Sequence, residues 1–265
     1  MRKFLAIAAG VSMLAFCGAA PAPVQVVYAG SLVTPMERAV GPAFSRDCAC
    51  PFQGEGKGSV ALAKMIEGGV RNPDVFISAD SRLMDELLHP GTGKPFISKY
   101  VIFGAAQLVL GYSPRSAFGA KFRSVGAGKT AVAALLKEPG LRLGRTDPKL
   151  DPKGIRTVHA LRGLGLSADL GEIFPEEDLL VRLESGDLDA AFLYSTESKS
   201  RNVPAVNLPA AATRDPIRYS FAILDSAANP QGAQKFENFL LTGPGKAILE
   251  AAGVTYVDPN VEHRK

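Results

Sequence analysis

The chain has 265 residues, of which 46% are hydrophobic and 21% charged, so it is long enough for two lobes that each bury a core. The formal net charge is +4, and two of those charges, Arg2 and Lys3, lie in a segment that we expect to be removed. This weak charge, without a basic run, excludes an extended nucleic-acid surface.

Residues 1–22 have the pattern of a secretory signal peptide: a charged start, an apolar stretch and a small-residue end. The apolar stretch is too short to span a bilayer, and a short buried helix is the alternative. Residues 14–17 resemble a lipoprotein cleavage box. Phe16 is too large for the position before Cys17, so we favour cleavage without a lipid tether. We therefore expect an exported, periplasmic protein.

Strands and helices alternate along the rest of the chain. The apolar runs predict strands over 24–28, 48–53, 75–78, 101–110, 141–145, 189–194 and 219–224. The spacing of apolar residues predicts helices over 32–45, 59–68, 80–88, 129–137, 154–164, 176–185, 230–241 and 243–252. This alternation indicates an α/β fold whose sheets are mostly parallel and covered by helices on both faces.

Two segments could join two such lobes. The stretch 101–110 is long enough to cross between them, and the polar, proline-containing stretch 195–215 could carry the chain back. We therefore expect a discontinuous first lobe of residues 23–104 and 206–265, and a second lobe of residues 105–205. Ligands of open α/β sheets bind beyond the carboxyl ends of the strands, and Ser31, Ser59, Asp151 and Tyr194 all follow or end predicted strands, so each is expected on that rim of its own lobe.

Two serines begin predicted helices in the same way, each after a glycine at the end of a strand. They are Ser31 after Gly30 and Ser59 after Gly58, 28 residues apart. Hydroxyls and free backbone N–H groups at two such helix starts could bind an anion without any fixed positive charge. The plain alternative is that each serine is an N-cap. The glycines of the run 54–58 favour binding at Ser59, because they let the backbone approach a bound group closely.

Three further candidates lie in the expected second lobe. Asp151 precedes a predicted helix, where it could cap that helix or bind a ligand. Glu176 lies in the first turn of the next helix, where the helix dipole favours an acid. Tyr194 ends a buried strand, and its phenol needs a partner from the backbone or a ligand. A charged Asp151 would repel an anion, so a binding role for it needs a further reason.

Other patterns predict little chemistry. Cys48 and Cys50 would lie about 7 Å apart on an extended strand, which suits a disulfide poorly, and the three histidines lack metal-ligand spacing. We expect structural or free thiols. The run 126–130 resembles the end of a phosphate-binding loop but lacks its first glycine. The chain has no Gly-x-Ser-x-Gly elbow, so we expect neither a nucleotide cofactor nor a hydrolase of that type.

The order and spacing of several motifs resemble the periplasmic molybdate and tungstate receptors of ABC importers. The matching segments are 27–32, 58–63, 74–80, 151–154, 183–194 and 238–253. The resemblance implies the type II two-lobed periplasmic binding protein fold, with the oxyanion in the cleft between the lobes. It also implies an importer permease with its ATPase as partners. We further expect a monomer and no cofactor besides the transported anion.

Carried over by position, the resemblance implies a set of oxyanion-binding residues. They are Gly30, Ser31, Gly58, Ser59, Asp151, Lys153, Glu176 and Tyr194. Asp151 and Glu176 match a subgroup in which two carboxylates also reach the metal, and Glu177 is the alternative to Glu176. Because a hexavalent metal is a hard acid that suits carboxylate oxygens, we hypothesise a six-oxygen shell around it.

Two other functions remain open at this point. One is a receptor for phosphate or sulfate, since two acids could accept hydrogen bonds from a protonated phosphate. The other is a secreted enzyme that uses Asp151, Glu176 and Tyr194 for acid–base work, although no nucleophile or cofactor motif accompanies them. The sequence does not separate molybdate from tungstate.

Overall fold

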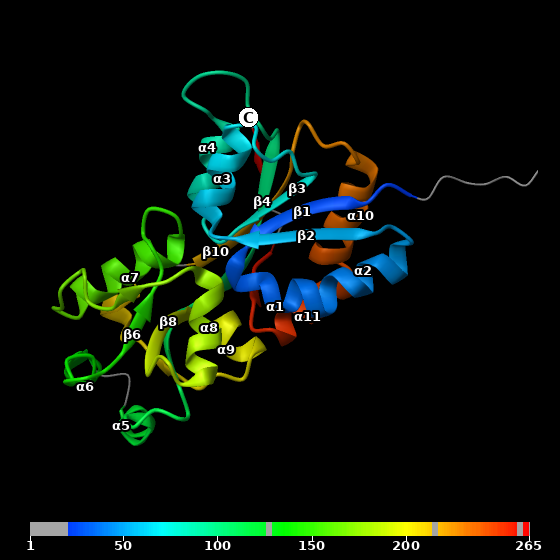
Figure 1. The fold of residues 1–265 in the computed structure, drawn as a ribbon. Helices are drawn as coiled ribbons and strands as arrows, with labels where there is room; N and C mark the ends of the chain where they lie inside the picture. Colours follow the sequence, from blue (N-terminus) through cyan, green and yellow to red (C-terminus); the bar gives the residue numbers. More distant parts are fainter. Residues whose placement is uncertain (1–20, 126–128, 214–216, 259–261, 265) are drawn as a thin grey trace, which may run out of the picture.

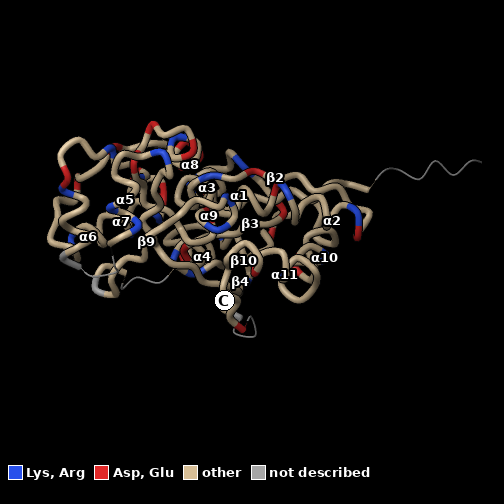
Figure 2. Tube along the Cα trace, turned by 90° about the horizontal axis from the view of Figure 1, so that it is seen from below, with Lys and Arg blue, Asp and Glu red and all other residues tan. Residues whose placement is uncertain are grey.

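The protein consists of two α/β lobes that lie side by side (Figure 1). The computed structural model describes residues 21–125, 129–213, 217–258 and 262–264. Most of the predicted leader, with Cys17, and the glycines of the run 126–130 lie outside the described residues. Within the described part, no helix is long and apolar enough to cross a membrane. Figure 2 shows basic and acidic positions intermixed along both lobes.

The first sheet has the strand order β11-β4-β10-β3-β1-β2, with β12 also paired to β4. Its strands are β1 (Val24–Ala29), β2 (Phe52–Lys57), β3 (Val75–Ser78), β4 (Lys99–Ala106), β10 (Ile217–Ile223), β11 (Thr255–Tyr256) and β12 (Glu262–Arg264). Strand β1 is parallel to β2 and β3, whereas β10 is antiparallel to β3 and β4. The parallel strands β1, β2 and β3 therefore end at one edge.

The second sheet has the order β7-β6-β8-β5-β9. Its strands are β5 (Leu108–Tyr112), β6 (Leu143–Arg145), β7 (Glu172–Ile173), β8 (Ala190–Tyr194) and β9 (Ala205–Asn207). Strand β6 is parallel to β7 and β8, and β5 is antiparallel to β8 and β9. The predicted α/β class is confirmed. Both sheets are mixed: β10, β11 and β12 run opposite to the other strands of the first sheet, and β5 runs opposite to those of the second.

Helices cover both faces of the first sheet, as Figure 1 shows. The α-helices are α1 (Val33–Pro35), α2 (Gly41–Cys48), α3 (Ser59–Glu67), α4 (Ser81–Leu88), α5 (Gly119–Ser124), α6 (Lys129–Leu135), α7 (Pro152–Gly163), α8 (Glu176–Ser185), α9 (Ser195–Ser200), α10 (Pro230–Leu241) and α11 (Pro244–Ala251). Alternate residues of β1 face different cores: Tyr28 packs with Phe44 and Phe236, and Val27 with Leu62. This two-sided burial explains why β1 is apolar almost throughout.

The crossing between the sheets differs in detail from the single strand expected over 101–110. Strand β4 ends at Ala106 and β5 begins at Leu108, so only Gln107 joins the first sheet to the second. The N–H of Gln107 donates to Ser195 Oγ at 3.2 Å, and its carbonyl accepts from the Ser195 N–H at 2.8 Å. The chain returns between β9 and β10. The residue limits of the lobes stay a prediction.

One predicted strand is misplaced. Residues Gly30–Val40 form the short segments η1 (Gly30–Leu32), α1 and η2 (Met36–Val40), and α2 continues the helical path to Cys48. Ala49, with φ 47°, ends this path in the left-handed region, and β2 begins only at Phe52. Cys48 and Cys50 are both free thiols, as expected. They do not share an extended strand, so that part of the reasoning is wrong.

The glycines of β2 also have another role than expected. A methyl group on Gly54 would lie 2.7 Å from Tyr28 Oη, and one on Gly56 would lie 2.9 Å from the Tyr28 ring. These glycines make room for a buried tyrosine of the neighbouring strand. Gly56 also lines a small cavity beside Gly30 and Ser31.

Candidate functional site

The two segments that we call the serine turns, Gly30-Ser31 after β1 and Gly58-Ser59 after β2, lie together at one edge of the first sheet. The parallel register pairs Tyr28 with Gly56, so the segments that follow β1 and β2 leave the sheet at the same level. Ser31 is 2% exposed and Ser59 is 1% exposed. Neither side chain makes an N-cap hydrogen bond. The N-cap alternative is therefore wrong for both serines, and their burial needs another explanation.

Each serine hydroxyl has one protein partner and can still donate its hydrogen. Ser59 Oγ accepts from the N–H of Ala79 at 3.1 Å. Ser31 Oγ lies 2.9 Å from Tyr219 Oη, which is also 3.0 Å from Thr196 Oγ1. If Thr196 donates to Tyr219 and Tyr219 donates to Ser31, the hydrogen of Ser31 is left for a ligand. Sequence reasoning missed this chain of hydroxyls.

The two acids each have one oxygen engaged and one without a partner. Asp151 caps α7, since its Oδ1 accepts from the Lys153 N–H at 2.8 Å. Glu176 begins α8, and its Oε1 accepts from Lys153 Nζ at 3.0 Å. Asp151 Oδ2 and Glu176 Oε2 are buried and have no hydrogen-bond partner among the described residues. The cap interpretation of Asp151 holds, but it accounts for only one of the two oxygens.

A buried lysine lies between these acids, which corrects the expectation of a site without fixed positive charge. Lys153 is fully buried, and its Nζ donates to Glu197 Oε1 at 2.8 Å as well as to Glu176. It also lies 5.6 Å from the ring centroid of Tyr194. Glu197 Oε2 accepts from the Tyr194 N–H at 2.7 Å. Glu197 is thus a component of the site that the sequence analysis did not identify.

Burial shifts the proton affinity of this cluster. Burial, with the nearby charge of Asp151, raises the pKa of Glu176 to about 7, although Lys153 opposes the shift. Burial likewise raises the pKa of Asp151 and of Glu197. Burial alone would lower the pKa of Lys153, but the surrounding carboxylates raise it above its usual value. The lysine is therefore charged.

Tyr194 completes the second lobe's contribution. Its side chain is buried at the end of β8, and its Oη has no hydrogen-bond partner within the described part of the chain. Burial raises the pKa of this phenol well above its usual value, so it keeps its hydrogen. A buried phenol normally has a partner, and this one is free to donate to a ligand.

The serine turns and the acids face each other across the lobes. A methyl group on Gly30 would overlap the carboxyl group of Glu176, and one on Gly58 would lie 2.6 Å from the Leu150 carbonyl and 3.3 Å from Asp151 Cβ. The Ala61 N–H, in the first turn of α3, donates to the Leu150 carbonyl at 3.2 Å. The structure thus gathers all eight predicted residues at one place.

A small cavity lies at this meeting point. Its volume is about 90 Å³, and Gly30, Ser31, Glu176 and Glu197 are among its lining residues. Glu177, the alternative acid, also lines it, but its side chain is exposed whereas Glu176 is buried. Among the described residues, no three histidine, cysteine or acidic side chains gather into a metal site. Within the described residues, Asp151 and Glu176 therefore do not belong to a larger cluster of metal-binding side chains.

A buried ion pair also links the two lobes near the site. Arg156 NH1, from α7, lies 3.6 Å from Asp80 Oδ2, from the turn after β3. Asp80 accepts from the Arg82 N–H and thereby caps α4. Burial opposes the charge on Asp80, but Arg82 and Arg156 lower its pKa. Sequence reasoning missed Arg156, because its partner comes from the other lobe.

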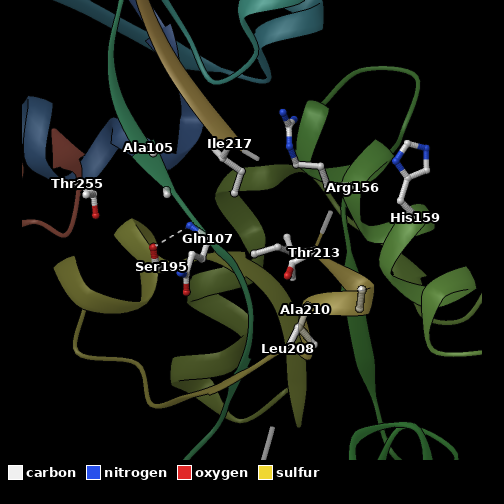
Figure 3. Close-up of a pocket in the computed structure, with 13 residues that line it drawn as sticks. Ala105, Gln107, Arg156, His159, Ser195, Leu208, Ala210, Thr213, Ile217 and Thr255 are labelled. Atoms are coloured by element: carbon white, nitrogen blue, oxygen red, sulfur yellow. Dashed lines mark hydrogen bonds between the residues drawn. The ribbon is translucent and has the colours of Figure 1, made fainter. Parts of the chain in front are cut away.

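A much larger cavity lies elsewhere (Figure 3). Its volume is about 940 Å³, and it is lined by the crossing segments around Gln107 and Ile217 and by Arg156 and His159 of α7. It shares no lining residue with the small cavity and contains none of the eight predicted residues. Buried polar atoms without partners, and not cavity volume, therefore mark the candidate site.

Residues 24–255 match the family described as bacterial extracellular solute-binding protein. The chain belongs to this family. This match confirms the resemblance to solute-binding receptors that the sequence motifs indicated.

Individual relatives are similar over most of their length. A Haloferax volcanii protein, provisionally named an ABC transporter molybdenum-binding protein, is 32% identical over 87% of this chain and 77% of its own. The molybdate/tungstate-binding protein WtpA of Thermococcus kodakarensis is 23% identical over 79% of this chain and 74% of its own. The solved periplasmic molybdate-binding protein of Azotobacter vinelandii matches with a TM-score of 0.71 at 22% identity, covering 89% and 99% of the two chains. This structural match shows a shared fold.

Proposed function

We propose that this protein is an extracytoplasmic receptor that captures molybdate or tungstate and delivers it to an ABC importer. The observation that carries the proposal is the pair of buried, unpartnered oxygens on Asp151 and Glu176. They lie among the hydroxyls of Ser31, Ser59 and Tyr194. The names of the Haloferax and Thermococcus relatives support the same ligand class.

The donors and the acids have separate tasks in this proposal. The hydroxyls of Ser31, Ser59 and Tyr194 donate to the oxo groups of the anion. Asp151 Oδ2 and Glu176 Oε2 each give one oxygen to the metal centre and raise its coordination from four oxygens to six. A hexavalent metal accepts hard oxygen ligands, which explains how two acids can belong to an anion site. Nearby Lys153 and Arg156 offset part of the negative charge.

The same arrangement selects against sulfate and phosphate. Their shorter bonds to oxygen would leave buried donors stretched, and an unsatisfied buried donor costs about 1–3 kcal/mol. Their central atoms also keep four oxygens, so the free carboxylate oxygens would repel them. A protonated phosphate could instead donate to Asp151 Oδ2 or Glu176 Oε2, which makes phosphate the anion to test most carefully.

The remaining parts of the proposal concern partners and location. Capture by hinge closure of two lobes, and delivery to a membrane permease with its ATPase, follow from the receptor role. The receptor is a periplasmic monomer without a cofactor, exported by residues 1–22 and not tethered through Cys17. An acid–base enzyme built on Asp151, Glu176 and Tyr194 is not proposed, because the family consists of receptors.

Calorimetry and thermal unfolding with molybdate, tungstate, phosphate and sulfate test the proposal. A ligand at 100 times its Kd stabilises the native state by about 2.7 kcal/mol, so molybdate or tungstate should raise the Tm clearly. X-ray absorption of the bound anion should show two more oxygens than its four oxo groups. Binding of phosphate or sulfate in preference to both metal oxyanions would refute the proposal.

A further inference from the structure

The starting observation is how Lys153 divides the two oxygens of Glu176. Lys153 Nζ lies 3.0 Å from Glu176 Oε1, while Oε2 has no hydrogen-bond partner in the described ranges of the chain. The overlap that a methyl group on Gly30 would make with Glu176 shows that Oε2 faces the serine turn of the first lobe. One oxygen is therefore held by the lysine, and the other is directed at the meeting point of the lobes.

The ammonium group of Lys153 is itself fixed from the far side. Glu197 Oε1 accepts from Nζ at 2.8 Å, and Glu197 Oε2 accepts from the Tyr194 N–H at 2.7 Å. Each oxygen of Glu197 thus accepts a hydrogen bond, so this acid anchors the lysine. The lysine side chain is fully buried and has no room to swing into solvent. Its ammonium contacts the carboxylates of Glu176 and Glu197.

The backbone N–H of Lys153 engages one oxygen of Asp151, as its ammonium engages one oxygen of Glu176. The Lys153 N–H donates to Asp151 Oδ1 at 2.8 Å, and Asp151 Oδ2 is left without a partner among the residues that the structure describes. One residue, through its N–H and its ammonium, therefore engages one oxygen of each acid. A carboxylate can bind a metal with one oxygen or with two, and an oxygen that already accepts a hydrogen bond favours binding through the other one.

We propose that the Lys153 ammonium is a positioning group that restricts Glu176 to a single oxygen ligand for the metal of the bound oxyanion. This inference rests on the proposed function. Without the ammonium, the Glu176 carboxylate is free to turn and to offer both oxygens, or to withdraw from the anion. Groups that orient metal ligands in this way typically contribute about 10–100-fold to affinity.

The test compares Lys153→Met with Lys149→Met on the purified protein. Lys149 lies four residues earlier with an exposed side chain, so this control makes the same change of charge and volume outside the cluster. We expect Lys153→Met to weaken tungstate binding by about 10–100-fold in calorimetry, and Lys149→Met to leave it unchanged. The tungsten absorption edge of the bound anion should change in Lys153→Met, because the number or arrangement of its oxygens changes.

A second variant covers the case in which Lys153→Met fails to fold. Lys153→Met combined with Glu197→Gln removes both ends of one buried ion pair, so Glu197 leaves no uncompensated charge. Thermal unfolding establishes that the variant is folded. We expect it to show the same altered absorption edge and the same loss of affinity.

The outcomes separate this inference from the proposed function. If the unchanged protein binds neither molybdate nor tungstate, the proposed function fails. If the unchanged protein binds tungstate, and a folded variant without Lys153 binds it with the same affinity and the same absorption edge, only the positioning role is overturned.

Discussion

Replacing Gly30 with alanine tests whether the contact between the lobes shapes the binding site. The added methyl group would overlap the Glu176 carboxyl group. Glu176 cannot simply turn away, because Lys153 holds its Oε1 at 3.0 Å. Either that ion pair breaks, or the lobes stay apart by about 1–2 Å to restore a normal contact distance.

The expected magnitude follows from that displacement. Binding sites tolerate shifts of about 0.5 Å, so a larger one should weaken tungstate binding by about 10–100-fold, or about 1.4–2.8 kcal/mol. If the lobes stay apart, the ligand-free variant should unfold close to the original Tm; if the buried ion pair breaks, its Tm should fall. Calorimetry measures the affinity, and differential scanning calorimetry measures the Tm.

Gly91→Ala is the matched control for this experiment. A methyl group on Gly91 would have no atom within 4 Å, so the same chemical change meets open space. We expect this variant to bind tungstate like the original protein. Equal affinity for Gly30→Ala, Gly91→Ala and the original protein would refute the conclusion that the contact between Gly30 and Glu176 shapes the site.

Three further predictions follow from the site. Asp151→Asn should keep the cap of α7 but weaken tungstate binding. Asp151→Ala should weaken binding and also lower the free energy of unfolding by about 0.5–2 kcal/mol in urea titrations, because the cap is lost. Equal stability of the two variants would contradict the capping role. Tyr219→Phe should weaken tungstate binding by about tenfold in calorimetry, since the hydroxyl that orients Ser31 is lost; unchanged affinity would exclude the hydroxyl chain. In the ligand-free protein, Glu176 has a pKa of about 7, raised from 4.5, so the folded state holds a proton that the unfolded chain has released between these values. The free energy of unfolding should therefore fall as the pH rises from about 5 to 7 and change less above pH 7; Glu176→Gln should flatten this slope, and an unchanged slope would contradict the raised pKa.

The sequence located most elements because their signals are local. The helix α8 and the strand β3 have the predicted limits, and α10 does as well. The strand predicted over 48–53 failed, because the helical path runs on to Cys48 and ends only at the left-handed residue Ala49. Nothing in the apolar pattern marks such an ending, since packing of α2 against the first sheet decides how far the helix extends.

Some residues of the site could be predicted from their sequence neighbours, whereas others depend on partners far away in the chain. Glycine-serine turns after strands and an aspartate at a helix start are visible in the sequence, and they led to Ser31, Ser59 and Asp151. The capping bond of Asp151 is made two residues away, so the sequence could suggest it. Glu197 and Tyr219 escaped notice, because neither belongs to a motif, and their partners lie 44 and 188 residues away.

The sequence by itself determined that Ser31, Ser59 and Asp151 lie in turns between strands and helices. Such turns form through interactions between residues only a few positions apart. Only the tertiary structure decided that a buried lysine engages one oxygen of Glu176 and that the Gly30 turn faces the other. The physical reason is that a buried charge is tolerated only where the packed lobes supply its partners, and those partners come from separate elements of the chain.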